Sequence, residues 1–166
     1  NKRALNYNLD YFNRVDNKEF DDLIHQAAKI IVNSHEVICS GIGLSDAIAK
    51  FAASLFNRKG KRTMYSGDFS SRFRGMYDQN DCALFFTVSG ETREVIDRIK
   101  DLKKYDIKII VITNSASSAA AKMSDLALTY YMPSTKNGDF YSSATQVPVV
   151  YIIESIANLF IEYGIY

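Results

Sequence analysis

Short apolar stretches alternate with helix-forming stretches along most of this chain, and few folds accommodate that order. Five stretches have the length and composition of buried strands, namely residues 36–40, 62–65, 82–88, 108–113 and 126–132. Helical patterns follow at residues 46–57, 93–104 and 119–123. Because strand–helix–strand units place successive strands in parallel with right-handed connections, we predict an α/β fold. Its core is a five-stranded parallel sheet sandwiched by helices, flavodoxin-like or Rossmann-like.

Two helices are predicted before the first strand. Residues 1–15 have a helical pattern but no place in the core of such a sheet. Residues 16–33 are amphipathic and begin with Asp16 and Glu19, which resemble an N-terminal capping pair. We expect residues 1–15 to be a helical arm or linker and residues 16–166 to form one domain.

The last helix is predicted over residues 140–162, with a kink at Pro148. It is apolar around most of its circumference, whereas a helix that packs on one sheet needs a single apolar stripe. The surplus face predicts a homodimer or higher homo-oligomer. The alternative is that arm residues cover this face within one chain, namely Leu5, Leu9, Tyr11 and Phe12.

The composition excludes several functions. A length of 166 residues suits one domain. Twenty basic residues against nineteen acidic ones give a net charge of +1, so nothing indicates nucleic-acid binding by this chain itself. The basic cluster at residues 58–62 is interpreted as a solvated turn. No apolar run approaches the roughly 18 residues that span a bilayer, and we expect no membrane association.

The two cysteines, Cys39 and Cys82, both lie in apolar stretches. They form no disulfide framework and no metal-ligand spacing, so we interpret them as small buried thiols. We therefore expect a cytoplasmic protein without a metal site.

Gly and small hydroxyl residues follow three of the predicted strands, at residues 41–45, 87–92 and 113–118. In a parallel sheet these loops share the carboxyl edge, where ligands bind. Each loop also opens a helix, whose free N–H groups and positive dipole end attract anions. The sequence therefore predicts a ligand that carries a phosphate. For any single loop, the alternative is that the hydroxyls simply cap the helix.

Two nucleotide-binding patterns are excluded. The third Gly of a dinucleotide GxGxxG motif would fall at position 46, which is Asp46, and no acidic residue ends the second strand, where Tyr65 and Ser66 stand. No P-loop sequence occurs either. We expect no cofactor.

The pattern Gly41-x-Gly43-x-Ser45, taken with the stretch from Thr87 to Thr92, resembles the sugar isomerase (SIS) domain. Residues 112–115 and the Ala121-x-x-x-Asp125 pattern resemble it too, and the likeness covers roughly residues 20–160. SIS domains are five-stranded parallel α/β modules, typically dimeric or tetrameric, that bind phosphorylated sugars. The family usually has Ser where Thr87 stands, and the hydroxyl is kept.

This resemblance implies a set of ligand-binding residues. Thr87, Ser89 and Thr92 would hold the phosphate, and Ser45 would contact the sugar or the phosphate. The full implied set is Gly43, Ser45, Thr87, Ser89, Gly90, Glu91, Thr92 and Ser143.

The stretch at residues 140–146 resembles RpiR/MurR-type transcriptional regulators, which usually have Arg where Ala144 stands. In those proteins a helix-turn-helix domain precedes the SIS domain. The chain starts at Asn1 without Met, and we expect it to be part of such a protein. The resemblance implies a phosphosugar-sensing and dimerisation domain of a regulator of carbohydrate metabolism. DNA would be bound only through a helix-turn-helix domain absent from this chain.

A stand-alone phosphosugar isomerase is the alternative. Aldose–ketose isomerisation needs a base and an acid, and SIS isomerases commonly take a Glu or His from around the last helix. This chain has no His after His35, and both His25 and His35 precede the first strand. Glu91 and Asp139 remain as bases, with Glu91 better explained as a helix N-terminal acid, and a partner subunit could lend a His. We predict no catalytic residues here; a purely structural dimer without a ligand is the third alternative.

Overall fold

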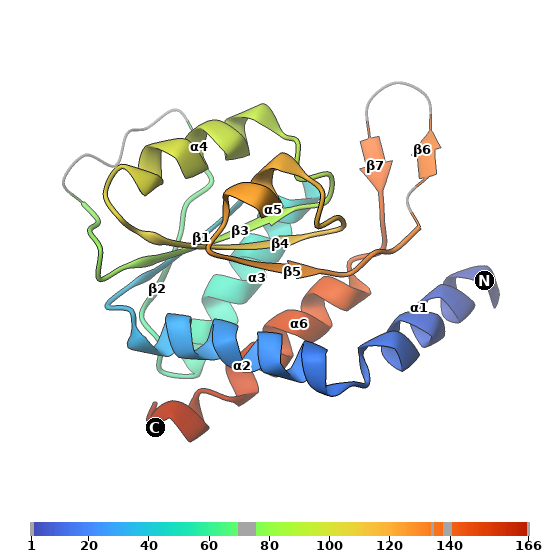
Figure 1. The fold of residues 1–166 in the computed structure, drawn as a ribbon, viewed down its shortest axis with the longest axis horizontal. Helices are drawn as coiled ribbons and strands as arrows, with labels where there is room; N and C mark the ends of the chain where they lie inside the picture. The colour runs from blue at the N-terminus through green and yellow to red at the C-terminus, as the bar shows by residue number, and fades with distance from the viewer. Residues whose placement is uncertain (1, 70–75, 134, 138–140, 166) are drawn as a thin grey trace.

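The five predicted strands form one parallel sheet in the computed structural model, which confirms the fold class. The structure describes residues 2–69, 76–133, 135–137 and 141–165. For residues 135–137 and 141–143 it describes the backbone but not the side chains. The strand order is β2-β1-β3-β4-β5, and every pair is parallel (Figure 1). The strands are β1 (Val37–Gly41), β2 (Thr63–Tyr65), β3 (Cys82–Thr87), β4 (Lys108–Thr113) and β5 (Leu126–Thr129).

Helices cover both faces of the sheet (Figure 1). On one face lie α4 (Arg93–Lys103) and α5 (Ala119–Met123). On the other lie α2 (Lys18–Asn33), α3 (Leu44–Arg58) and α6 (Val147–Asn158). Every residue of β1 and β3 is buried, because helices cover both faces of the sheet and successive side chains of a strand point to opposite faces.

The strand register brings the loops after β1, β3 and β4 to one edge of the sheet. Gly41 pairs with Phe86, and Thr87 pairs with Thr113, so these three strands end at the same level. The chain direction across the sheet reverses between β1 and β3, since β2 lies on one side of β1 and β4 on the far side of β3. Open α/β sheets bind ligands at this switch point.

The start of α2 is one residue later than predicted. Asn17, not Asp16, is the capping residue, and its Oδ1 accepts a hydrogen bond from the Phe20 N–H at 2.9 Å. Asn17 has an extended backbone, which aims its side-chain oxygen at the first turn. The predicted pair of Asp16 and Glu19 was therefore wrong.

The prediction for the C-terminal region was wrong in two respects. Residues 141–143 form β7 (Tyr141–Ser143), which pairs antiparallel with β6 (Thr135–Asn137), where a loop and the start of a helix were expected. Pro148 does not kink α6, because it lies in the first turn of that helix. A proline there costs no hydrogen bond, since the first N–H groups of a helix have no partner within it.

The chain ends in a short 3₁₀ turn, η1 (Ile161–Tyr163), after α6. β5 is shorter than predicted. It covers only Leu126–Thr129, because the side chain of Asn114 binds the backbone of Met132. Asn114 Oδ1 accepts from the Met132 N–H at 2.6 Å, and Asn114 Nδ2 donates to the Met132 carbonyl at 2.8 Å. Tyr131, which precedes Met132, has a left-handed φ of 47°, and this conformation interrupts the extended backbone of the strand.

The N-terminal helix, α1 (Lys2–Val15), lies at the end of α2 and projects away from the sheet (Figure 1). Its Tyr11 is buried, and the rings of Phe12 and Tyr151 of α6 meet edge to face at 5.2 Å. Leu5 and Leu9 stay 58% and 52% exposed. Of the four arm residues that the intramolecular alternative placed on α6, Tyr11 and Phe12 therefore pack there, whereas Leu5 and Leu9 remain largely exposed.

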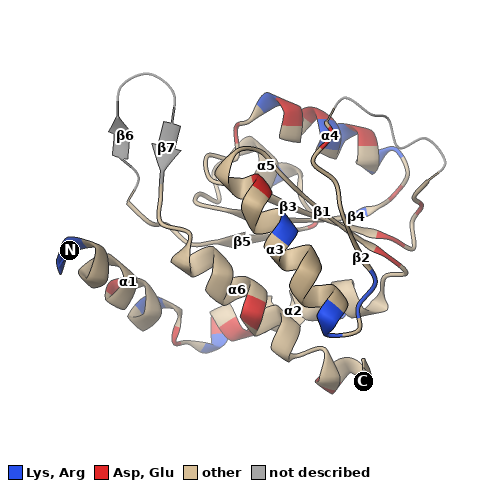
Figure 2. Ribbon diagram, turned by 180° about the vertical axis from the view of Figure 1, so that it is seen from behind, with Lys and Arg blue, Asp and Glu red and all other residues tan. Residues whose placement is uncertain are grey.

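The basic cluster at residues 58–62 is not wholly a solvated turn. Lys61 is buried, and its ammonium donates to the carbonyls of Val32, at 3.3 Å, and Ser34. Burial lowers the pKa of Lys61. Basic and acidic residues both occur on α3 and α4, as Figure 2 shows.

Candidate functional site

The loop after β3 folds back on its own hydroxyl groups. The buried Thr87 accepts a hydrogen bond at Oγ1 from the N–H of Gly90, at 3.1 Å. Ser89 Oγ accepts from the N–H of Glu91, also at 3.1 Å. A hydroxyl has one hydrogen to donate besides its acceptor positions. Both hydroxyls are acceptors in these bonds, which therefore do not use their O–H donors.

Gly90 is required by close packing. Its φ is +67°, a conformation that L side chains rarely adopt. A Cβ at this position would overlap the hydroxyl of Ser118 and lie 3.0 Å from Thr113 Oγ1. The carbonyl of Gly90 accepts from the N–H of Ala120 at 2.9 Å, so this loop is fixed against the start of α5.

Glu91 is an N-terminal acid of a helix, but of α5 and not of α4, which it precedes. Its Oε1 accepts a hydrogen bond from the N–H of Ala119 at 2.8 Å, and Ser118 caps the same helix through Ala121 at 3.3 Å. The carboxylate thus bridges two loops of the carboxyl edge.

The start of α4 has no side-chain cap. Thr92 occupies the cap position without a hydrogen bond from its side chain to the helix, whereas Asn17 caps α2 and Ser118 caps α5. The alternative that hydroxyls merely cap the helix does not apply to Thr92. The first N–H groups of α4 lie directly after Ser89 and Gly90, where an anion would meet them.

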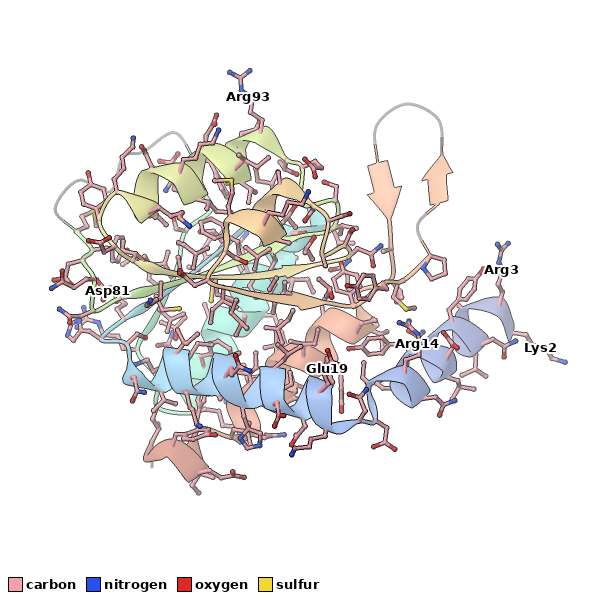
Figure 3. All side chains as sticks on the ribbon, viewed as in Figure 1. Lys2, Arg3, Arg14, Glu19, Asp81 and Arg93 are labelled. Carbon is pink, nitrogen blue, oxygen red and sulfur yellow. The ribbon has the colours of Figure 1, made fainter. Side chains whose placement is uncertain are left out.

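The cation that begins this helix is turned away from the helix start. Arg93, the first residue of α4, points into solvent (Figure 3). Its side chain is 91% exposed and approaches Asp97 at 3.6 Å. The loops after β1, β3 and β4 themselves contain no Lys or Arg, so they offer an anion backbone N–H groups and hydroxyls.

The start of α3 is also open. Gly43 occupies its cap position with φ 64° and no side chain, and Ser45 in the first turn is buried. A Cβ on Gly41 would overlap the backbone of Ser45. Since β1 and β3 are neighbours, the open starts of α3 and α4 flank the switch point.

The loop after β4 uses its polar groups within the protein. Asn114 holds Met132, the hydroxyls of Ser115 and Ser117 lie 2.9 Å apart, and Ser118 caps α5. It supports the loop after β3 through Thr113, whose hydroxyl donates to Val88 O at 3.2 Å.

Ser143, the remaining predicted site residue, lies in β7 rather than at a helix start. Its side chain falls outside the described part of the structure. Asp139, one of the bases considered above, also lies outside the described residues.

One group at this edge was missed by the sequence reasoning. Tyr65, at the end of β2, donates its hydroxyl to Asp46 of α3, whose other oxygen lies 2.9 Å from the ammonium of Lys50. The Lys50 ammonium also lies 5.0 Å from the centre of the Tyr65 ring. The hydrogen bond from Tyr65, followed by that from Lys50, lowers the pKa of Asp46. The four-residue spacing of Asp46 and Lys50 was the signal available in the sequence.

Neither histidine of the chain lies at the carboxyl edge. His25 Nδ1 is 2.6 Å from the hydroxyl of Tyr163. His35 precedes β1, beside Asp81 at the amino end of the sheet, with 3.7 Å between Nδ1 and Oδ1 (Figure 3). The thiols of Cys39 and Cys82 are buried, which raises the pKa of Cys82 to about 12.

The described residues contain neither a metal-ligand cluster nor a membrane-spanning helix. In that part of the chain, no three His, Cys, Asp or Glu residues are grouped so as to hold a metal ion. No helix there combines the length and the apolar character needed to cross a membrane.

A groove of about 760 Å³ lies between α1, α2 and α6, lined partly by Phe12, Phe20 and Tyr151. Its lining includes no residue of the loops after β1, β3 or β4.

The chain belongs to the SIS domain family, whose sequence model matches residues 30–152. Among curated proteins, it is 28% identical over 142 residues to an HTH-type transcriptional regulator of Clostridium perfringens, covering 82% of this chain and 50% of the regulator. It is also 28% identical over 123 residues to the arabinose 5-phosphate isomerase KdsD of Francisella tularensis, covering 68% and 36%. The chain spans only 18% to 50% of the length of the first curated relatives that it matches.

Solved structures share the fold. The sugar isomerase domain of an RpiR transcription factor from Sphaerobacter thermophilus has a TM-score of 0.80 at 18% identity, over 98% of this chain and 87% of that one. The Vibrio vulnificus NanR protein complexed with ManNAc-6P has a TM-score of 0.80 at 22% identity, over 98% and 61%. The chain is thus similar both to regulators and to isomerases.

Proposed function

We propose that residues 16–166 bind a phosphorylated sugar as the effector-sensing and dimerisation domain of an RpiR-type transcriptional regulator of carbohydrate metabolism. Residues 1–15 are the helical arm of this domain. DNA contacts belong to a helix-turn-helix segment outside this chain, and the protein acts in the cytoplasm.

The observation that carries the proposal is the uncapped start of α4 behind a hydroxyl-rich loop. The phosphate accepts hydrogen bonds from the N–H groups of the first turn of α4 and from the hydroxyls of Thr87, Ser89 and Thr92. Thr87 and Ser89 are already oriented by the backbone N–H groups that they accept. Little ordering is needed when the ligand arrives, which favours affinity.

The sugar extends from the phosphate across the switch point towards α3. Gly43 allows the backbone to approach the ligand closely, and Ser45 and Ser143 contact the sugar. Gly90 and Glu91 hold the phosphate loop in place through their hydrogen bonds to Ala120 and Ala119.

A sensing role is favoured over catalysis by what the described edge offers a substrate. Proton transfer between adjacent carbons needs a base within hydrogen-bond reach of the substrate. Glu91 is engaged with Ala119, and both histidines lie elsewhere. The Asp46 carboxylate is already occupied by Tyr65 and Lys50. The similarity to the Clostridium and RpiR regulators supports the same choice.

A phosphosugar isomerase is the second candidate. The similarity to KdsD over 68% of this chain favours it. Its base would come from Asp139 or from a partner subunit.

Titration calorimetry tests the proposal. A panel of pentose and hexose phosphates, including arabinose 5-phosphate and ManNAc-6P, is compared with the same sugars without phosphate. Binding of at least one phosphorylated member, with no binding of its dephosphorylated counterpart, is expected. Equal binding of both forms, or no binding of any phosphate, would contradict the proposal.

A further inference from the structure

The cluster of Asp46, Lys50 and Tyr65 is not among the groups proposed to hold the phosphate, yet it lies at the edge where the ligand is proposed to bind. Asp46 follows Ser45 directly in the first turn of α3. Tyr65 is the last residue of β2 and donates its hydroxyl to Asp46. A Cβ on Gly67 would lie 2.9 Å from Asp46 Oδ1, so the loop after β2 is packed closely against this carboxylate.

Asp46 lies beside the strand that carries the proposed phosphate loop, because α3 follows β1 and β1 is the neighbour of β3. Tyr65 pairs beside Cys39 of β1, and Gly41 of β1 pairs beside Phe86 of β3. Neighbouring strands are about 4.8 Å apart, so Asp46, which follows β1, lies one strand spacing from the loop after β3. Tyr65 lies two spacings across and three residues back, about 14 Å from Thr87 at the end of β3. A ligand whose phosphate lies at the start of α4 brings its opposite end over β1 to this cluster.

The charges of the cluster are internally paired. The Asp46 carboxylate accepts from the Tyr65 hydroxyl and from the Lys50 ammonium, the latter at 2.9 Å. These hydrogen bonds keep the carboxylate ionised. The positive charge of Lys50, the cation of this cluster, is correspondingly engaged by Asp46, so at the described residues of the cluster an incoming anion meets a paired ammonium and a fixed negative charge.

We infer that Asp46, held by Tyr65 and Lys50, selects ligands whose end opposite the phosphate is uncharged. This inference rests on the proposed function and names the class of ligand that the same site takes: sugar monophosphates, as opposed to bisphosphates or phosphorylated sugar acids. Hydroxyl groups can donate to the carboxylate and accept from the ammonium without separating the pair. A second phosphate or a carboxylate is repelled by the Asp46 carboxylate, and like charges in juxtaposition cost several kcal/mol. The selection thus works by repulsion as well as by attraction.

Matched ligand pairs test this inference. Each pair differs mainly in charge at the end remote from the shared phosphate: glucose 6-phosphate with 6-phosphogluconate, arabinose 5-phosphate with 5-phosphoarabinonate, and fructose 6-phosphate with fructose 1,6-bisphosphate. For the monophosphate that binds, we expect the wild type to prefer the neutral member by at least about tenfold, a modest part of a like-charge contact.

Two substitutions should move this preference in opposite directions. Asp46→Asn removes the negative charge and frees Lys50, so the preference should fall by about tenfold or reverse. Lys50→Gln leaves the carboxylate without its cation, so the preference should rise; Lys50 is exposed, and this change leaves the core intact. Asp10→Asn is the matched control, because it breaks an i,i+4 pair with Arg14 on α1, at 3.0 Å, and should leave the preference unchanged.

The outcomes separate the two claims. If no monophosphate in the panel binds, the proposed function and this inference both fail. If a monophosphate binds but its charged counterpart binds as well, or if neither Asp46→Asn nor Lys50→Gln changes the ratio, the inference alone is overturned. In that case the cluster serves only to hold the loop after β2 against α3.

Discussion

Gly90 lies so close to Ser118 that a single carbon added to the glycine would overlap the serine hydroxyl. The contact joins the loop that precedes α4 to the cap of α5. The carbonyl of Gly90 and the carboxylate of Glu91 reinforce it, since they accept from the N–H groups of Ala120 and Ala119 at 2.9 and 2.8 Å. The geometry of the proposed phosphate loop therefore depends on α5 as much as on the helix it opens.

Gly90→Ala should destabilise the fold by about 2–5 kcal/mol. The left-handed backbone costs roughly 1–2 kcal/mol, and overpacking against Ser118 adds about 1–3 kcal/mol. Gly164→Ala is the control, because Gly164 also has a positive φ but has no atom within 4 Å of the added carbon. Urea unfolding of both variants measures the difference. Equal losses in the free energy of unfolding would show that the contact with Ser118 does not contribute to stability.

Ser89→Ala should weaken binding of the sugar phosphate by about 1–3 kcal/mol, the cost of losing one hydrogen bond to a charged group. Calorimetry on the wild type and the variant gives the value. Ser155→Ala is the matched control, because the Ser155 hydroxyl bonds to the carbonyl of Tyr151 within α6, at 2.7 Å. Unchanged affinity in Ser89→Ala would remove Ser89 from the site.

The sequence predicted the five strands and their parallel arrangement, because short apolar runs such as 82–87 and 108–113 suit strands buried on both faces and alternate with helices. It left the order of the strands within the sheet open between flavodoxin-like and Rossmann-like. It predicted the two open helix starts for a related reason: Gly and hydroxyl residues directly follow two of those strands. Contacts between residues far apart in the sequence could not be predicted from it. The sequence does not reveal that Glu91 caps α5 or that Tyr65 meets Asp46.

Local competition explains the boundary errors. Both Asp16 and Asn17 can cap a helix, and the backbone conformation at Asn17 decided between them. Pro148 is compatible with a kink inside a helix or with a helix start, and the pairing of β6 with β7 upstream fixes the second.

No isomerase activity is expected from this chain. A proton-exchange assay in deuterated water, run over the pentose and hexose phosphates used for calorimetry, should show no exchange above the buffer rate. KdsD on arabinose 5-phosphate is the positive control. Steady turnover at about 1 s⁻¹ or faster, ordinary for enzymes, would favour the isomerase candidate instead.

Homodimers are expected at micromolar concentration, with the exposed apolar face of α1 in the interface. Light scattering should give twice the mass of 18.8 kDa. Leu9→Lys places a charge on this face and should shift the equilibrium towards the monomer, because burying an unpaired charge is costly. Asn6→Lys adds the same charge at an exposed polar position of α1 and should not. A monomeric wild type would contradict this expectation.

The location of the phosphate is the central point, and amide chemical shifts can report it directly. In a ¹⁵N-labelled chain titrated with the tightest-binding sugar phosphate, the largest shifts should occur at the N–H groups of residues 89–95, which span the loop after β3 and the first turn of α4. The dephosphorylated sugar should leave these N–H groups unshifted. If the shifts instead gather in the groove between α1, α2 and α6, with residues 89–95 unmoved, the phosphate does not bind at the start of α4.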